Sequence, residues 1–418
     1  MWHSVISGCV LWFVCQPAGG HGTAGRETGR IVTRRVVSPG ITLIRESVAA
    51  NATEGPLSAS LLLVDLKRSG VRVTAALGGD RVWGTDPTSG REIVSAMAKR
   101  RRAVAAVNAG FFPLGGNPIG LHIQDGEIVT EPGASRTCLL IDRGNRARLD
   151  AFSFAGQAVA KTKGRTARFS LSGMNRRPGA KEALLLFTPT FAERTLKQPA
   201  RTEVVLAGIR TPILPNRTYA GRVKTIGQGG ESPLSKNTVV LSGIGPGAAF
   251  LRRYALPGRT LSFRPGVSSL SGRPVRFTDI RTAVSGGPRL IRNGKVTIRA
   301  AAEGFSSGFA VTRHPRTAAG ITRDGKLLLA VVDGRRKTVS RGMSLSELAA
   351  LLLKYDTRDA VNLDGGGSSV MIVHGRVVNT PSDGRERPVA NALLVFGPDS
   401  DKKSGRVRAK SAARRGKS

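Results

Sequence analysis

The chain has 418 residues, of which 40% are hydrophobic, and a net charge of +37 from 65 Lys and Arg against 28 Asp and Glu. This length is sufficient for one large domain or two ordinary ones with a substantial core. Cys138 is the one cysteine outside the first apolar run, which excludes an intramolecular disulfide in the body of the chain. The charge is suited to loose contact with polyanions, but the basic residues are dispersed, which favours a compositional bias as their explanation.

The two ends of the chain differ from its body. Residues 5–14 are apolar, too short to span a bilayer, and are followed by small residues up to Ala24. This pattern predicts a signal peptide over residues 1–24 and therefore export to the periplasm or the medium. No other stretch is long and apolar enough to cross a membrane. Residues 398–418 are basic and poor in apolar side chains, and we expect a disordered tail with nonspecific affinity for polyanions.

Between these ends, residues 25–56 are predicted to form a polar lead-in with one strand, and residues 57–397 a single large catalytic domain. Short apolar runs separated by tight turns indicate a β-rich α+β fold, with mixed or antiparallel sheets, hairpins and a few helices packed on them. Four dipeptides lie between apolar runs at hairpin positions: Asp125-Gly126, Asn293-Gly294, Asp324-Gly325 and His374-Gly375.

Two helices are predicted with the same design. Ser89 to Glu92 and Ser344 to Glu347 each fit a capping box at the start of a helical pattern. Each helix leads into an apolar strand, and these strands end at Asn108 and Asn362. The shared arrangement indicates either an internal duplication or chance. If the two units are related, both asparagines would face one cleft.

The run 361–369 carries the strongest chemical signal. Period two places Asn362 and Asp364 on one face of the strand, with Leu363 buried on the other. The three glycines that follow allow a tight turn that exposes backbone N–H groups, and Ser368 adds a hydroxyl. A carboxylate beside such a loop is suited to binding and cleaving a phosphate-bearing substrate. The alternative is a plain glycine-rich turn.

Further candidates have structural explanations of similar weight. Asp333 follows the apolar run 327–332, but Asp333-Gly334 also fits an ordinary turn. Arg316, taken alone, is a surface cation. The histidines have no metal-ligand spacing, so no cofactor is predicted. A glycine-rich loop with Asp364 could hold a divalent cation, but no ligand set can be identified from the sequence.

Eight segments in order resemble the phosphodiester glycosidase family and together cover about residues 60–397. They are Asn108–Phe112, Gly173–Arg176, Ser285–Leu290, Arg316–Gly320, Val332–Arg335, Gly342–Leu345, Asp359–Ser369 and Arg387–Val389. The resemblance implies hydrolysis of a sugar C1–O–phosphate bond, which releases a free sugar and a phosphomonoester. Cell-envelope or exopolysaccharide glycans are the expected substrates. The alternative is a non-catalytic envelope module that binds anionic glycans.

The resemblance also implies the residues of the site. Asp364 is expected to be the base or nucleophile, and Asp333 the second carboxylate. The expected substrate-binding residues are Asn108, Arg316, Asn362, Gly366, Gly367, Ser368 and Arg387. Among these, the two arginines would neutralise the phosphate, the asparagines would orient sugar hydroxyls or water, and the glycine N–H groups would complete the cradle.

Overall fold

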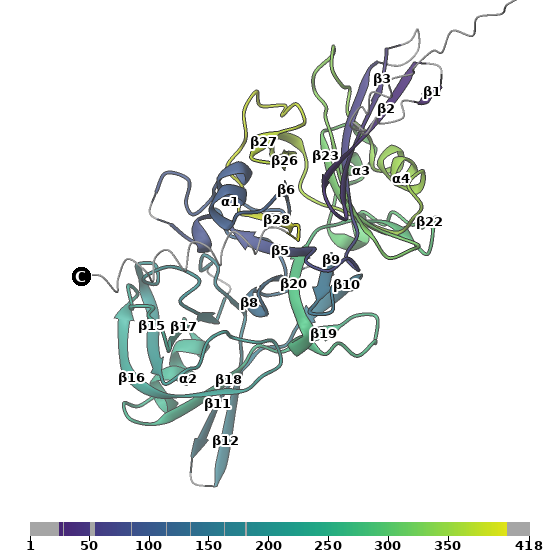
Figure 1. Cartoon of the computed structure of the whole chain (residues 1–418). Helices are drawn as coiled ribbons and strands as arrows, with labels where there is room; N and C mark the ends of the chain where they lie inside the picture. Colours follow the sequence, from purple (N-terminus) through teal and green to yellow (C-terminus); the bar gives the residue numbers. More distant parts are fainter. Residues whose placement is uncertain are drawn as a thin grey trace, which may run out of the picture.

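The computed structural model describes residues 25–398 except 28, 51–54, 85, 114, 134, 163 and 180–181. The predicted signal peptide (1–24) and residues 399–418 of the predicted basic tail lie outside these residues. The described chain folds into four β-sheets with few helices (Figure 1). All of its neighbouring strands pair antiparallel except β13 and β14, which are parallel. The predicted β-rich α+β class is therefore confirmed.

Two sheets form the part of the molecule that carries the candidate site. The nine-stranded sheet has the order β1-β2-β3-β4-β24-β23-β25-β21-β22. Its strands are β1 (Gly25–Glu27), β2 (Arg30–Ser38), β3 (Ile41–Val48), β4 (Leu57–Val64), β21 (Arg289–Arg292), β22 (Lys295–Val296), β23 (Arg316–Thr322), β24 (Leu327–Val332) and β25 (Thr357–Asn362). The five-stranded sheet has the order β27-β26-β6-β28-β5. Its strands are β5 (Arg72–Leu77), β6 (Ala105–Asn108), β26 (Met371–Val373), β27 (Arg376–Val377) and β28 (Asn391–Phe396).

Two further sheets make up the rest. The six-stranded sheet, of order β19-β10-β9-β20-β7-β8, contains β7 (His122–Gln124), β8 (Glu127–Thr130), β9 (Thr137–Asp142), β10 (Ala147–Phe154), β19 (Val267–Ser269) and β20 (Ile280–Ser285). The eight-stranded sheet, of order β12-β11-β18-β16-β15-β17-β14-β13, contains β11 (Gln157–Thr162), β12 (Arg165–Ser170), β13 (Gly173–Met174), β14 (Leu184–Phe187), β15 (Gln198–Ala207), β16 (Tyr219–Gly229), β17 (Thr238–Gly243) and β18 (Thr260–Arg264). The helices are α1 (Val94–Arg101), α2 (Pro246–Tyr254), α3 (Ser307–Val311), α4 (Leu345–Leu353) and the 3-10 turns η1 (Gly78–Asp80), η2 (Phe277–Asp279), η3 (Ala301–Glu303) and η4 (Gly366–Ser368).

The nine- and five-stranded sheets pack face to face, with a helix on each outer face. Side chains of β24 alternate: Leu329 enters the core between the sheets, while Leu328 packs against α4 on the other side. In β28, Leu393 enters the shared core and Leu394 packs towards α1. Both faces of these strands are buried, which explains why they are continuously apolar instead of alternating.

The two predicted capping boxes have different outcomes. Ser344 and Glu347 form the reciprocal box at the start of α4. The Ser89 box is wrong: α1 begins at Val94 after Ile93, without a side-chain cap. Glu92 instead accepts a hydrogen bond from the N–H of Gly79 and pairs with Arg100. The prediction failed because a tertiary partner competed for the carboxylate of Glu92.

All four predicted hairpins are present, connecting β7–β8, β21–β22, β23–β24 and β26–β27. In three of them both turn residues adopt positive φ, as in Asn293 (50°) and Gly294 (77°), which is the geometry that favours Asn-Gly.

The segment 25–56 contains three strands rather than the single one expected. β3 pairs with β4 from Ile41↔Val64 to Val48↔Leu57, and β2 extends the sheet. The segment is therefore continuous with the nine-stranded sheet. In the described part of the chain, no helix is long and apolar enough to span a membrane.

Candidate active site

The glycine loop 364–368 lies where the nine- and five-stranded sheets meet. β25 ends at Asn362, Leu363 enters the core between the sheets, and Asp364 begins the loop. The N–H of Asp364 donates to the carbonyl of Ala109 (2.9 Å), just beyond β6. The N–H of Leu363 donates to Thr317 O (2.8 Å) in β23. The loop is thus bound to both sheets, and these bonds fix the backbone from which the Asp364 side chain extends.

Asn108 connects the two sheets beneath this loop. Its Nδ2 donates to the carbonyl of Asp364 (2.7 Å), and its Oδ1 accepts from the hydroxyl of Thr317 (2.8 Å) and the N–H of Val370 (3.1 Å). The residue is fully buried. Its polar atoms are therefore occupied by the protein, and its position supports the loop rather than contact with a sugar.

Asn362 lies close by and is fully buried as well. Its Nδ2 donates to the carbonyls of Gly287 (2.9 Å) and Leu363 (2.8 Å), while its Oδ1 has no hydrogen-bond partner among the described residues. Both asparagines bind the backbone at residues 363–364, so the two strand ends lie together, whereas the predicted cleft between the two side chains is not seen in the described part of the chain. Both point into protein rather than into open solvent.

Asp364 has the electrostatics expected of a reactive carboxyl. The residue as a whole is half-buried, but its carboxyl group is surrounded by protein, and this desolvation raises its pKa to about 6. The Ser368 hydroxyl and the charge of Arg387 oppose the shift without cancelling it. A carboxyl that titrates near neutral pH is able to exchange protons under ordinary conditions, which is a common property of catalytic acids and bases.

Cations gather around the glycine loop. The Arg387 guanidinium pairs with Asp383 through two hydrogen bonds to one carboxylate oxygen (2.9 and 2.7 Å), and this pair lies directly against Gly367. A Cβ at Gly366 would lie 3.4 Å from the guanidinium of Arg335. The exposed side chain of Arg335 also reaches His314 Nδ1 at 3.3 Å. Of these, Arg387 was predicted, whereas Arg335 and Asp383 were missed.

Arg316 is not the surface cation that its sequence context indicates. Only 1% of it is exposed, and its Nε and Nη2 donate to the carbonyls of Met343, Phe309 and Thr312 at 2.7–2.9 Å. Its guanidinium lies over the Phe309 ring at 4.9 Å. Burial lowers its pKa to about 10. These contacts tie α3 to the start of α4, and Arg316 thereby supports the backbone beside Pro315, whose carbonyl binds the N–H of Gly366.

Asp333 is buried at the end of β24, and both of its carboxylate oxygens have donors. Ser58 Oγ donates to one oxygen (2.9 Å), and Asn379 Nδ2 and the N–H of Thr380 donate to the other (2.9 and 2.8 Å). Desolvation raises its pKa. Asn379 in turn donates to Ser369 O (3.2 Å). Asp333 therefore fixes the segment 379–380 against the loop, with little of its hydrogen-bonding capacity left over.

Of the two glycine N–H groups predicted for the cradle, that of Gly366 is already bound by the protein, whereas the one of Gly367 has no backbone acceptor among the described residues. The N–H of Gly366 donates to Pro315 O (2.9 Å), and those of Ser368 and Ser369 close the η4 turn onto Gly365 and Gly366. Ser368 is buried beside Asp364. Within the described residues, no three His, Cys, Asp or Glu side chains gather as metal ligands.

An aromatic cluster of Phe111, Phe305 and Phe309 borders the site. Phe305 and Phe309 stack at 4.9 Å, and Phe111 contacts both. Arg136 lies over the Phe305 ring at 4.5 Å, and Arg316 lies over the Phe309 ring at 4.9 Å. Phe111 belongs to the segment Asn108–Phe112, the first of those that resemble the family, so the sequence already placed it near Asn108.

Comparisons with known proteins agree with the motifs. Residues 254–396, about a third of the chain, match the family model described as phosphodiester glycosidase. The N-acetylglucosamine-1-phosphodiester alpha-N-acetylglucosaminidase of Bos taurus is 42% identical over 109 residues, which make up 24% of this chain and 20% of that protein. The chain thus matches about a fifth of the length of this curated relative.

Two solved structures are similar over most of the chain. A protein of Burkholderia pseudomallei K96243, described as exported, is 28% identical, with a TM-score of 0.66 over 82% of this chain and 74% of its own. A hypothetical protein from Synechocystis is 20% identical, with a TM-score of 0.70 over 88% of this chain and 64% of its own, and it shows the fold alone. The resemblance predicted from the motifs is confirmed over residues 254–396, which contain Asp364 and the arginines around it, and the family is one of hydrolases.

Proposed function

Because residues 254–396 match the phosphodiester glycosidase family, we propose that the chain hydrolyses a sugar-1-phosphodiester. Water adds to the anomeric carbon C1, and the bond between C1 and the bridging oxygen breaks. The bridging oxygen stays on the phosphate, so the products are a free sugar and a phosphomonoester. The observation that carries this proposal is the Asp364 carboxyl, whose pKa is raised to about 6 in a loop flanked by Arg387 and Arg335.

Asp364 is the proposed base or nucleophile. With a pKa near 6 it is mainly ionised at neutral pH, yet it is more basic than an ordinary aspartate, and such a match between pKa and working pH favours proton transfer. The phosphomonoester is a fair leaving group, so stabilisation of its charge matters more than protonation. A single reactive carboxyl beside cations suits this chemistry better than the two matched carboxyls of ordinary glycosidases.

The phosphate is assigned to the cations on the open side of the loop. Arg387 and Arg335 carry guanidinium groups that offer paired donors to phosphate oxygens. Arg316 and Asp333 are assigned positioning roles, because their polar atoms are occupied by backbone and side chains. Asn108 and Asn362 are likewise positioning residues that set the backbone direction at Asp364.

The name of the Bos taurus relative makes N-acetylglucosamine the first sugar to test. An anionic glycan of the cell envelope or an exopolysaccharide is the proposed natural substrate, which agrees with the net charge of +37 and with the exported description of the Burkholderia protein. Export through the N-terminal segment is part of the same proposal.

The test is release of free N-acetylglucosamine from UDP-N-acetylglucosamine and from the methyl phosphodiester of N-acetylglucosamine 1-phosphate. The full chain is compared with Asp364→Asn and with the matched control Asp279→Asn, an exposed aspartate by the six-stranded sheet. We expect the Asp364 variant to lose roughly 10²–10⁴-fold in turnover and the control to keep its activity. Equal rates in the two variants would remove Asp364 from the mechanism. Saturable binding without product would favour the non-catalytic alternative. The same assay with added chelator measures whether the release of sugar requires a divalent cation.

A further inference from the structure

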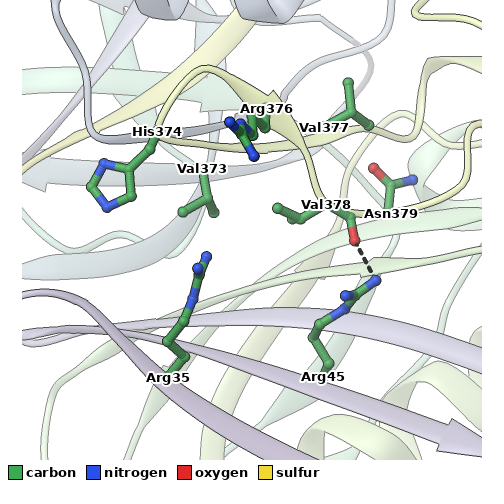
Figure 2. A pocket seen from close by; sticks show the side chains of 8 residues that line it. All are labelled: Arg35, Arg45, Val373, His374, Arg376, Val377, Val378 and Asn379. Carbon is green, nitrogen blue, oxygen red and sulfur yellow. Dashed lines mark hydrogen bonds between the residues drawn. The ribbon is translucent and has the colours of Figure 1, made fainter. Parts of the chain in front are cut away.

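A cationic pocket lies beside the candidate active site, between the nine-stranded and five-stranded sheets. It has a volume of about 500 Å³ and is enclosed by β2 and β3 on one side and the β26–β27 hairpin on the other (Figure 2). Its lining residues are Arg35, Arg45, Val373, His374, Arg376, Val377, Val378 and Asn379. Three arginines and a histidine thus line it, and no carboxylate does.

Two of the three guanidinium groups are available to a ligand. Arg45 donates to the carbonyl of Val378 (2.9 Å) and joins the two walls. Arg35 and Arg376 have no hydrogen-bond or ion-pair partner within the described part of the chain. They approach the pocket from opposite walls (Figure 2). Uncompensated arginines on facing walls of a concave site favour an anion that is shared between them.

The pocket is joined to the glycine loop by Asn379. This residue lines the pocket, and its Nδ2 donates to Ser369 O (3.2 Å) and to Asp333 (2.9 Å). The chain leaves the glycine loop and enters β26 within two residues. Val370, which contacts Asn108, is three residues from Val373 in the pocket, or about 10 Å of extended chain. A substrate with several sugar–phosphate units is long enough to reach both places.

We propose that this pocket binds a second phosphodiester of a polymeric sugar-phosphate substrate while another phosphodiester is cleaved at Asp364. The proposal rests on the proposed function and narrows its substrate class to chains with repeated phosphodiesters. Guanidinium groups recognise phosphate oxygens through paired, charge-assisted hydrogen bonds. Free inorganic phosphate has the same chemistry, so the experiment must separate the two sources.

The kinetic test compares Arg35→Ala/Arg376→Ala with the full wild-type chain on two substrates. One carries a single sugar-1-phosphodiester, and the other is an oligomer with several sugar–phosphate repeats. We expect KM for the oligomer to rise about tenfold, with kcat unchanged, and KM for the single unit to stay constant. The control Arg168→Ala/Arg222→Ala removes the same charge from exposed positions on the eight-stranded sheet. Equal KM shifts on both substrates, no shift, or the same shift in the control would overturn the proposal.

A binding arm separates this proposal from the proposed function. The oligomer is titrated calorimetrically into Asp364→Asn with and without the two arginine substitutions, and inorganic phosphate is titrated as a second probe. We expect oligomer binding to weaken about tenfold on loss of the arginines. Inorganic phosphate that binds as tightly as the oligomer would assign the pocket to the free anion and overturn the substrate proposal. If wild-type protein releases no sugar but arginine-dependent oligomer binding persists, the proposed function fails while the binding role stands.

Discussion

The side-chain amide of Asn108, at the end of β6, donates a 2.7 Å hydrogen bond to the backbone carbonyl of Asp364, just beyond the end of β25. Together with the hydrogen bond from the N–H of Asp364 to the carbonyl of Ala109 (2.9 Å), this bond joins the five-stranded and nine-stranded sheets at the loop that carries the candidate catalytic carboxyl. The side-chain Oδ1 of Asn108 completes the link by accepting hydrogen bonds from the Thr317 hydroxyl and the N–H of Val370. The direction of Asp364 therefore depends on how the two sheets are held together.

Replacement of Asn108 by alanine is expected to lower the free energy of unfolding by about 3 kcal/mol, because the buried carbonyl of Asp364 and two buried donors lose their partner. Turnover should fall as well, since the loop loses its anchor. Urea unfolding followed by circular dichroism measures the first effect. Asn117→Ala, which removes one weak 3.4 Å bond at a partly buried position, serves as the control. A loss of turnover without any loss of stability would indicate direct contact between Asn108 and substrate instead.

Local sequence chemistry predicted part of this arrangement. Asn293-Gly294 determines its own hairpin through positive φ angles, and the apolar strands before Asn108 and Asn362 end where expected. The burial of Arg316 was not predictable in this way. It depends on α3 and the start of α4 covering the guanidinium, and nothing local distinguishes one arginine among 65 basic residues.

Long-range pairing set a second limit on what the sequence revealed. The segment 25–56 reads as polar because the strand β2 alternates weakly and is largely exposed, yet β3 pairs along its full length with β4. Whether such a strand forms is decided by its partner strands rather than by local apolar content. The cationic pocket could not be predicted for the same reason, because its two walls are far apart in sequence: Arg45 and Val378, which contact each other across it, are 333 residues apart.

Gly367→Ala is expected to impair phosphate binding while leaving the fold intact. The backbone of Gly367 does not have positive φ, but an added Cβ would overlap both the Arg387 guanidinium and the Asp383 carboxylate. Because this ion pair is partly exposed, it can move aside. We expect KM to rise about tenfold, as for one lost charge-assisted contact, with unchanged thermal unfolding. Gly227→Ala, where an added Cβ meets nothing within 4 Å, should leave KM unchanged, and an equal effect of the two substitutions would contradict the assignment.

The arginines Arg316 and Arg387, which the family resemblance groups together, should separate experimentally. Arg316→Ala removes three buried hydrogen bonds to carbonyls and should cost about 3–5 kcal/mol of unfolding free energy. Arg387→Ala breaks a partly exposed ion pair worth at most about 1 kcal/mol, but should raise KM. Parallel unfolding and steady-state measurements distinguish the two. A stable Arg316→Ala protein with a raised KM would contradict the positioning role and would indicate that Arg316 binds the substrate phosphate.

The raised pKa of Asp364 predicts that its ionised form destabilises the fold. An aspartate with a folded pKa of about 6, against the ordinary 3.8, stabilises the folded state when protonated. That contribution is complete below pH 4 and is lost as the pH rises through 6. Asp364→Asn should therefore equal wild type in stability near pH 4 and exceed it by roughly 1–3 kcal/mol at pH 8. Urea unfolding at both pH values provides the measurement, and a variant less stable than wild type at pH 8 would rule out desolvation as the dominant influence on this carboxyl.

Ionisation of Asp364 should also determine the acidic side of the pH–rate profile. If Asp364 acts as base or nucleophile, its carboxylate form is the active one, so kcat/KM for a sugar-1-phosphodiester should rise with pH through about 6 and then level off. Arg387→Ala removes a positive charge that lowers this pKa, so the midpoint should move to higher pH in that variant. Asp383→Asn frees Arg387 from its partner, and the midpoint should move the opposite way. Rates that fall above pH 6 would instead make Asp364 the general acid, and a midpoint that ignores both substitutions would place the titrating group elsewhere.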